Sequence, residues 1–307
     1  MEYFIICLAV VCFTGQFAFT KIFEKLVKSS FISTLVMLIV TSIFGALIFL
    51  IVGGFKVEFS LFSFILAIIF AIIMIPYYLI GVKVLSLGSL AVYSVFMMLG
   101  GMLVPFFYGV IFLSEQITIS KIIGTVLLTT FIILQGVSQE KNATPVKEEN
   151  RLINKNKKRL FFILCLVIFF INGLTGVIAK AHEIGPNPIN EASFSTLYCA
   201  LTALFSFIAL IIVMVKNRKT NPTSLKPVLK LKPIITMLLI GATAHTGNFL
   251  HLLVAEKVPA SVQFPLVSGG VIVLSAIASR VIFKEKITKV EWLSVLGAFI
   301  ATVLFAF

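Results

Sequence analysis

The chain contains no aspartate, and glutamate supplies all 12 of its acidic residues. Charged residues of either sign make up only 12% of the sequence, hydrophobic residues make up 60%, and the mean hydropathy is +1.13. Soluble globular domains usually contain about 25% charged residues, because water-facing surfaces need them. This scarcity of charge excludes a soluble domain and predicts a protein that crosses a membrane several times.

The residue types that build catalytic and metal centres are also few. The chain has three histidines and four cysteines, and no two cysteines form a CxxC motif. Each cysteine lies in an apolar stretch, where a small thiol behaves as a packing residue. No nucleophile–base pair, metal cluster or acidic constellation stands out. We therefore expect neither an enzyme nor a bound cofactor or metal; the cysteines are Cys7, Cys12, Cys165 and Cys199.

Ten apolar stretches dominate the chain. A helix of about 18 or more apolar residues is long enough to cross a hydrocarbon core about 30 Å thick. The first stretch carries Glu2 in its leader instead of a basic cluster, so we expect a mature helix and not a cleaved signal peptide. The sequence predicts an all-α membrane protein with spans at about 3–20, 31–53, 60–82, 87–113, 118–138, 160–180, 193–215, 233–255, 260–283 and 288–307.

The lysines and arginines predict how the spans are oriented. Numbered along the chain, the odd loops contain 21 of these residues and the even loops contain 4. Short basic loops remain on the cytoplasmic side of the membrane, so the odd loops are predicted to be cytoplasmic and both termini external. The net charge of +13 then serves topology and attraction to anionic lipids. No soluble domain or aromatic–basic pattern points to a nucleic-acid partner.

Two segments repeat each other at an offset of 170 residues. Phe112-Leu-Ser-Glu-Gln-Ile-Thr118 corresponds to Ile282-Phe-Lys-Glu-Lys-Ile-Thr288, and Gly100 corresponds to Gly270. The repeat predicts two halves, residues 1–138 and 160–307, joined by a basic cytoplasmic linker over 139–159. Five spans in each half is an odd number, so the second half enters the membrane from the opposite side. We therefore expect inverted-topology repeats, an arrangement typical of transporters.

A signature follows the fourth span of the second half. It consists of Glu285-Lys-Ile-Thr288, then Glu291-Trp-Leu, then Gly297 within an apolar stretch. These residues resemble the signature that ends each repeat of EamA-type members of the drug/metabolite transporter superfamily. The first half contains a weaker copy, Glu115-Gln-Ile-Thr118 followed by Gly124.

Two further features resemble the same family and extend the likeness over nearly the whole chain. Ala255-Glu-Lys-Val-Pro-Ala-Ser261 is similar to the short turn before the fourth helix of each repeat, and its counterpart is Lys83-Val-Leu-Ser-Leu-Gly-Ser89. Lys21 and Lys180 close the first span of each half. The resemblance implies a ten-helix basket with a central cavity lined by the first, third and fourth helices of each half. It also implies export or exchange of small metabolites or drugs.

The chain departs from the related small multidrug-resistance branch, which depends on a carboxylate in its first helix. At the corresponding depth this chain has Thr14, Gly15 and Gln16. All glutamates lie at span ends or in loops, with Glu256 the deepest. Because a charged side chain at the bilayer centre costs about 2.5–3.5 kcal/mol, spans keep one only for a function. Coupling to ions through a carboxylate is therefore not predicted.

Neutral polar groups inside the spans are the candidate cavity residues. His245 and Asn248 lie within about 60° of each other around their helix, whereas His251 lies about 120° from His245. His245 is interpreted either as a buried group bonded to a neighbouring helix or as a contact for substrate or a proton. Amides at this depth serve equally as bonds between helices or as ligand contacts. The candidates are Gln16, Tyr77, Tyr93, Asn172, His245, Asn248 and Gln263, with Tyr78 beside them.

Three prolines fall inside spans, at Pro76, Pro105 and Pro265. Each removes a helical amide and frees a carbonyl four residues earlier, so it bends the helix. Such a bend serves either as a gating kink or as a fixed element of shape. An apolar cavity with a few polar anchors favours an amphipathic or aromatic solute over a polyanion.

These patterns predict a secondary transporter in the cytoplasmic membrane that moves small organic solutes by alternating access. Its expected partners are a small-molecule solute and membrane lipids, and a homodimer is compatible with the sequence. The alternative is a membrane receptor or assembly subunit that does not transport. The solute, the direction of transport and the coupling ion are not readable from the residues.

Overall fold

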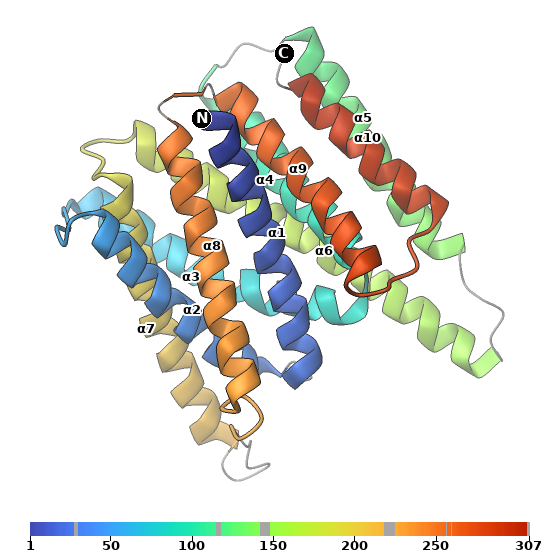
Figure 1. Cartoon of the computed structure of the whole chain (residues 1–307), viewed down its shortest axis with the longest axis horizontal. Helices are drawn as coiled ribbons and strands as arrows, with labels where there is room; N and C mark the ends of the chain where they lie inside the picture. Colours follow the sequence, from blue (N-terminus) through green and yellow to red (C-terminus); the bar gives the residue numbers. More distant parts are fainter. Residues whose placement is uncertain are drawn as a thin grey trace. The chain divides into compact units, whose positions relative to one another are not determined.

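The structure is a computed structural model that describes residues 1–27, 30–114, 118–141, 148–217, 225–255, 257–258 and 260–305. This part of the chain forms ten α-helices and no strand (Figure 1). The helices are α1 (Glu2–Val27), α2 (Phe31–Val52), α3 (Leu61–Leu87), α4 (Leu90–Phe112), α5 (Ile119–Lys141), α6 (Glu148–Ile184), α7 (Glu191–Asn217), α8 (Leu231–Ala255), α9 (Ala260–Val281) and α10 (Lys289–Phe305).

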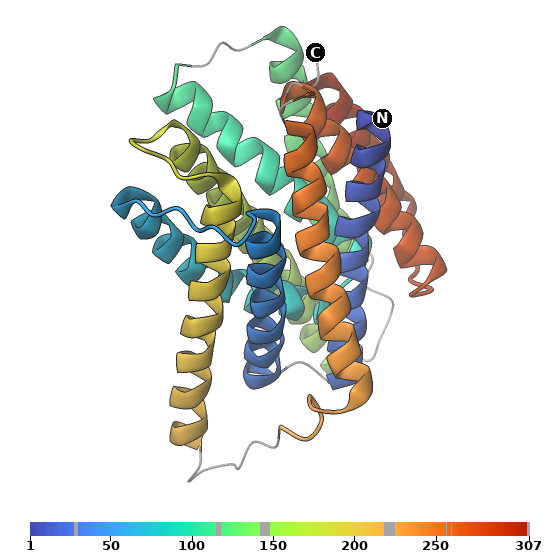
Figure 2. The same ribbon diagram turned by 60° about the vertical axis from the view of Figure 1, so that its left-hand side comes forward.

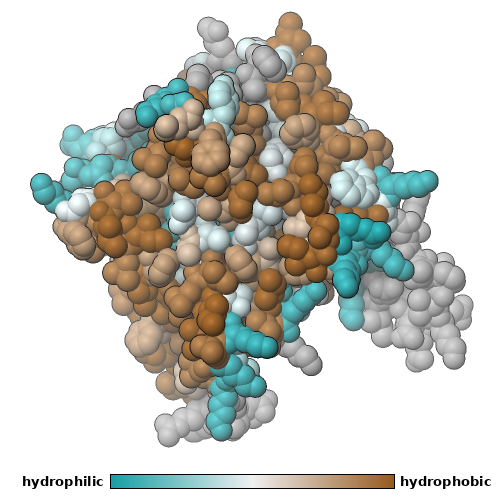
Figure 3. Space-filling model, viewed as in Figure 1, coloured by the Kyte–Doolittle hydropathy of each residue, from teal (hydrophilic) through white to brown (hydrophobic). Residues whose placement is uncertain are grey.

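Seven of these helices are long and apolar enough to cross a membrane: α1, α2, α3, α4, α6, α7 and α8. Hydrophobic residues cover most of the face seen in Figure 3. Exposed aliphatic side chains such as Ile111, Ile212 and Val215 would be costly in water but suit a lipid environment. The sequence prediction of a multi-span helical protein is thus confirmed for seven helices. The spans predicted at α5, α9 and α10 stay predictions; α10 has 17 residues, a length of about 25 Å.

The helices group into two compact units. Unit 1 comprises Met1–Thr14, Leu87–Gly176 and Leu250–Phe307, and unit 2 comprises Gly15–Ser86 and Val177–Phe249. Neither unit coincides with a half of the sequence, because each combines helices from both halves.

In unit 1, α4 packs against α9 and α5 packs against α10. Helix α10 also contacts α4 and α9. Figure 1 shows α5 and α10 side by side. At this contact Gly297 of α10 leaves room for the ring of Phe131, since an added Cβ would lie 2.0 Å from it. Gly297, which belongs to the predicted signature, therefore serves close helix packing.

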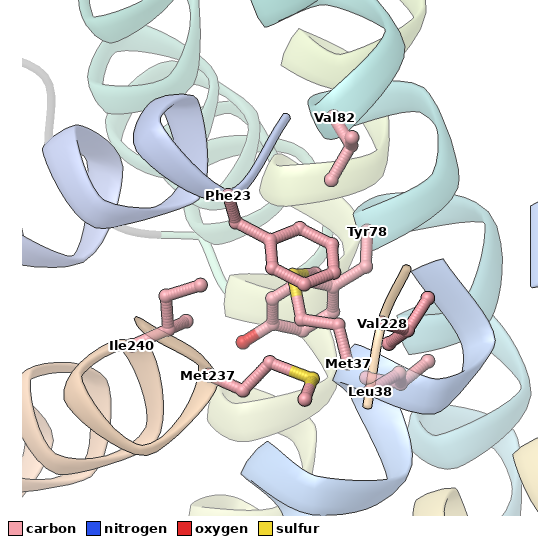
Figure 4. Close-up of a cluster of buried hydrophobic side chains, with 8 residues drawn as sticks. All are labelled: Phe23, Met37, Leu38, Tyr78, Val82, Val228, Met237 and Ile240. Carbon is pink, nitrogen blue, oxygen red and sulfur yellow. The ribbon is translucent and has the colours of Figure 1, made fainter. Parts of the chain in front are cut away.

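In unit 2, α2 packs along α7, and the two helices run side by side in Figure 2. The core next to them joins α1, α2, α3 and α8 with the turn before α8 (Figure 4). Burying each large apolar side chain away from solvent contributes about 1.5–3 kcal/mol in water and less in lipid, where packing contacts dominate. The cluster consists of Phe23, Met37, Leu38, Tyr78, Val82, Val228, Met237 and Ile240.

Helix boundaries repeat at the offset found in the sequence. Helices α8, α9 and α10 each begin 170 residues after α3, α4 and α5, respectively. Helix α6 differs, because it begins at Glu148, inside the segment predicted as a linker. Glu148 and Glu149 favour a helix N-terminus, and the leucine, lysine and arginine that follow are good helix formers. Residues 115–117 of the first motif copy, residues 142–147 of the linker and Glu256 lie outside the described residues.

Candidate functional site

A polar group lies among the apolar helices of unit 2, around Gln16 of α1. Gln16 is 8% exposed, and its side chain forms a hydrogen bond with Tyr78 of α3. Tyr77 lies edge-on to Tyr78, with ring centroids 5.2 Å apart. On α7, Tyr198 hydrogen-bonds with Ser195 and packs 4.4 Å from the ring of Phe70. Two of the predicted site residues, Gln16 and Tyr77, are therefore brought together with tyrosines of α3 and α7.

His245 of α8 packs against α2 within unit 2. Its Nε2 donates a hydrogen bond to the Thr41 carbonyl oxygen at 3.1 Å, since a carbonyl can only accept. The imidazole lies directly over Gly45, where an added Cβ would be 2.3 Å from Nε2. Nδ1 is buried and has no hydrogen-bond partner. The geometry favours the interpretation of His245 as a bond between α8 and α2 in this conformation.

The other α8 candidates lie in different surroundings. Asn248 is half-buried in unit 2. His251 belongs to unit 1, where its ring packs edge-on against Phe264, with centroids 4.9 Å apart. Gln263 of α9 is 1% exposed, and its Nε2 donates to the His251 carbonyl oxygen at 2.6 Å. Gln263 thus satisfies a carbonyl in the last turn of α8, where no helical amide follows.

Asn172 of α6 lies in unit 1 at a close crossing with α4. Its Nδ2 donates to the Met97 carbonyl oxygen at 2.6 Å. Glycines make this approach possible: a Cβ on Gly100 would lie 2.1 Å from the Phe169 carbonyl oxygen, and one on Gly173 would lie 2.3 Å from Val104. Small residues of this kind let two membrane helices approach closely enough for backbone contacts. Asn172 therefore ties α6 to α4 at their tightest contact.

The remaining predicted residues occupy helix interiors. Tyr93 is buried near the start of α4, at 4% exposure. Pro76 lies within α3 and Pro105 within α4. Pro105 fits beside Gly176 of α6, where a Cβ would meet its ring at 2.6 Å. Pro265 lies within α9, and its side chain is outside the described part of the structure.

Glu285 has a role that its position in a motif did not reveal. Its carboxylate accepts a hydrogen bond from the Leu90 backbone amide at 3.1 Å, in the first turn of α4, and another from the Ser279 hydroxyl of α9. Next along the chain, Thr288 and Glu291 form a capping box at the start of α10, with Glu291 accepting from the Thr288 amide at 2.7 Å. The signature residues thus join the ends of three helices within unit 1. The Thr-x-x-Glu spacing was the available signal for the cap.

His182, which the sequence did not single out, takes part in a buried network in unit 2. The Ser63 hydroxyl oxygen accepts hydrogen bonds from the Ser60 hydroxyl at 2.9 Å and from the Ile189 amide at 3.3 Å. Both lone pairs are then used, so the Ser63 proton is directed to His182 Nε2, 3.0 Å away. The His182 ring stacks on Phe194 with centroids 4.0 Å apart. This network fixes the α6–α7 turn against the start of α3.

Replacing Ser63 by alanine is expected to destabilise the protein by about 2 kcal/mol, because the Ile189 amide and His182 Nε2 lose their buried partner. Thermal unfolding of the purified protein in detergent measures the change as a Tm lower by several degrees. Ser86→Ala is the matched control, since Ser86 bonds only to the Lys83 carbonyl of its own helix. Equal melting temperatures for the two variants would contradict the network.

Glu58 connects the loop after α2 to the start of α7. Its carboxylate accepts from the Asn190 amide at 2.8 Å, and its own amide donates to the Ser193 hydroxyl at 3.0 Å. Asn190 in turn accepts from the Ser193 amide at 2.8 Å, as an N-cap residue does. The hydrogen bond from the Asn190 amide lowers the pKa of Glu58 below its ordinary value near 4.5.

A lowered pKa means that ionised Glu58 stabilises the folded state above pH 4.5, and that this contribution disappears as the pH falls through the folded pKa. Glu58→Gln is therefore expected to have a shallower loss of Tm below pH 4.5 than the parent protein. Above pH 5 the difference in Tm between the two should be constant. Melting curves across pH 3 to 7 measure this, and parallel curves below pH 4.5 would refute the assignment.

Within the described residues, no three or more His, Cys, Asp or Glu side chains gather closely enough to hold a metal ion. Comparison with known proteins finds no family model that matches the chain, and no curated protein sequence matches it. The EamA resemblance therefore stays a prediction. The hydrogen bonds of Gln16, Asn172, His245 and Gln263 each join two different helices, and they define what the candidate residues do in this conformation.

Proposed function

We propose that the chain is a secondary transporter of the EamA type, built from two inverted-topology repeats of five helices. The observation that carries this proposal is the pairing of helices five apart in the chain. Helix α4 packs on α9 and α5 on α10 in unit 1, and α2 packs on α7 in unit 2. Two copies of one bundle related by a two-fold axis place equivalent helices together at that axis. The 170-residue spacing of helix starts supports the same duplication.

Equivalent glycines give further support. Gly100 of α4 meets the backbone of α6, and Gly270 of α9 meets Val10 of α1. Helices α6 and α1 are themselves the first helices of the two proposed repeats. The same type of contact therefore occurs twice within unit 1, at positions separated by the repeat offset.

The chemistry of the candidate residues favours a neutral or amphipathic organic solute. The buried polar groups of α1, α3, α7 and α8 in unit 2 are amides, hydroxyls and one imidazole, placed among aromatic and aliphatic side chains. Such surroundings reward a ligand that brings apolar surface and one or two hydrogen-bonding groups. Export or exchange across the cytoplasmic membrane, with both termini outside, completes the proposal.

A two-step experiment tests the function. The purified protein is first screened for thermal stabilisation by a panel of amino acids, nucleobases and cationic dyes, since a ligand that prefers the folded state raises Tm. Stabilising compounds are then assayed for flux across proteoliposomes. Protein-dependent flux of a stabilising compound is the expected result. Stabilisation without any flux would instead support a receptor and refute transport.

A further inference from the structure

A groove opens at one end of unit 2, where α2 begins and α3 ends. It has a volume of about 270 Å³ and is lined by Ser30, Phe31 and Thr34 of the α2 end and by Leu79, Val82 and Lys83 of the α3 end. Phe31 is 48% exposed and Lys83 is exposed, so the groove is accessible from the surface. It is smaller than the pockets of about 300–1,000 Å³ that enclose drug-sized ligands.

The hydrogen-bonding capacity of the groove is concentrated on one cation. The Thr34 hydroxyl donates to the Ser30 carbonyl oxygen at 3.1 Å, and the Ser30 hydroxyl donates to Ser33 at 3.2 Å. Both hydroxyl protons are therefore already used within the first turn of α2. Among the lining side chains, the Lys83 ammonium supplies the donors for a ligand.

The charge around the groove is positive. Lys83 lies close enough to Glu24 of α1 to act on its charge, together with Lys21 and Lys25. Three cations surround one carboxylate in this part of unit 2. Opposite the charge, Leu79, Val82 and Phe31 form an apolar wall. The groove thus offers a cation and an apolar surface side by side at the lysine-rich end of the helices.

We propose that this groove binds the headgroup of an anionic phospholipid, with the phosphate on Lys83 and the upper part of an acyl chain along Phe31, Leu79 and Val82. Charge complementarity selects the anion, and the exposed apolar wall selects a molecule that is already in the membrane. The positive-inside pattern of the loops places this end on the cytoplasmic side, where anionic lipids are attracted to basic residues. The site is independent of the proposed transport.

Native mass spectrometry of the purified full-length chain tests the site, with phosphatidylglycerol and phosphatidylcholine titrated in parallel. Lys83→Gln is expected to weaken phosphatidylglycerol binding about fivefold, the effect of one lysine near a charged membrane surface. Phosphatidylcholine binding should be unchanged. Lys289→Gln, at the exposed first residue of α10, is the matched control and should retain the parent affinity. Equal phosphatidylglycerol affinities for Lys83→Gln and Lys289→Gln would overturn the proposal.

A second variant and a competitor distinguish a lipid from a free phosphate. Phe31→Ala removes part of the apolar wall and is expected to weaken phosphatidylglycerol binding, while excess inorganic phosphate displaces little of it. Complete displacement by inorganic phosphate, with Phe31→Ala binding normally, would assign the groove to a soluble anion and refute the lipid. Melting curves of all three variants should coincide with the parent, since the mutated side chains are exposed.

Discussion

Gly100→Ala is expected to prevent stable packing of α4 against α6 and to lower the free energy of unfolding by at least about 3 kcal/mol. The added methyl would lie 2.1 Å from the Phe169 carbonyl oxygen and 2.7 Å from its Cα. These are backbone atoms of a helix, so no side-chain rotation relieves the clash. In an ordinary helix the same substitution stabilises by about 1 kcal/mol, so the sign itself is informative.

Two other glycines provide a graded comparison for this prediction. A Cβ on Gly270 meets the Val10 side chain at 2.9 Å, and one on Gly15 meets the Thr243 methyl at 3.3 Å. Alanine at Gly270 should be less harmful than at Gly100, and alanine at Gly15 should change stability by less than about 1 kcal/mol. The yield of monodisperse protein and the Tm of the three variants measure the order. A Gly100→Ala protein as stable as Gly15→Ala would show that α4 and α6 do not cross here.

Glu285→Ala is the second substitution with a large expected effect, about 3 kcal/mol of lost stability. The carboxylate holds the Leu90 amide at the start of α4 and the Ser279 hydroxyl of α9. Hydrogen bonds to a charged group contribute about 1.5–3 kcal/mol each, and their removal leaves the partners unsatisfied. Glu285→Gln keeps one acceptor oxygen and should lie between the parent and the alanine variant in Tm.

Glu183→Ala controls for the loss of a glutamate as such. Glu183 pairs with Lys180 at 3.2 Å on the surface, where its side chain is 63% exposed. Surface ion pairs contribute about 0–1 kcal/mol, so this variant should melt close to the parent. If Glu285→Ala also melted close to the parent, the signature would have no role in joining α4, α9 and α10.

Hydropathy and the repeat offset predicted most of the fold. Apolar runs located the helices, because a polar backbone in lipid must satisfy its own hydrogen bonds and a helix does so internally. The offset of 170 residues predicted helix starts that recur in α3 and α8, α4 and α9, and α5 and α10. Helix α6 was predicted to begin about twelve residues too late, because hydropathy detects the apolar part of a helix and not its charged extension.

The candidate site was less accessible to sequence reasoning. Periodicity places a residue on a face of its own helix but does not say which helix that face meets. It therefore left open whether His245 bonds to a neighbour, whereas the structure gives the Thr41 carbonyl as its partner. The Ser63–His182 network was missed for the same reason, since its members are 119 residues apart. Neither residue stands in a recognisable motif.

Hydrogen bonds between helices also bear on how a carrier could work. A bond such as that from Asn172 to the Met97 carbonyl satisfies two polar groups that would otherwise be costly in lipid. Measured bonds of this kind in membrane proteins contribute about 0.6 kcal/mol on average, little enough for a substrate to replace them. The candidate residues can therefore hold helices together in one conformation and contact a solute in another.

The central claim is that the two halves are inverted copies, and the sidedness of equivalent loops tests it most directly. Single cysteines at Lys56 and Lys226, seven and six residues from the helix starts of α3 and α8 in the cysteine-free protein, report which side of the membrane each loop occupies. In whole cells a membrane-impermeant maleimide should label position 56 and leave position 226 unlabelled until the cells are lysed. Labelling of both positions from the same side would contradict inverted repeats and, with them, the proposed carrier.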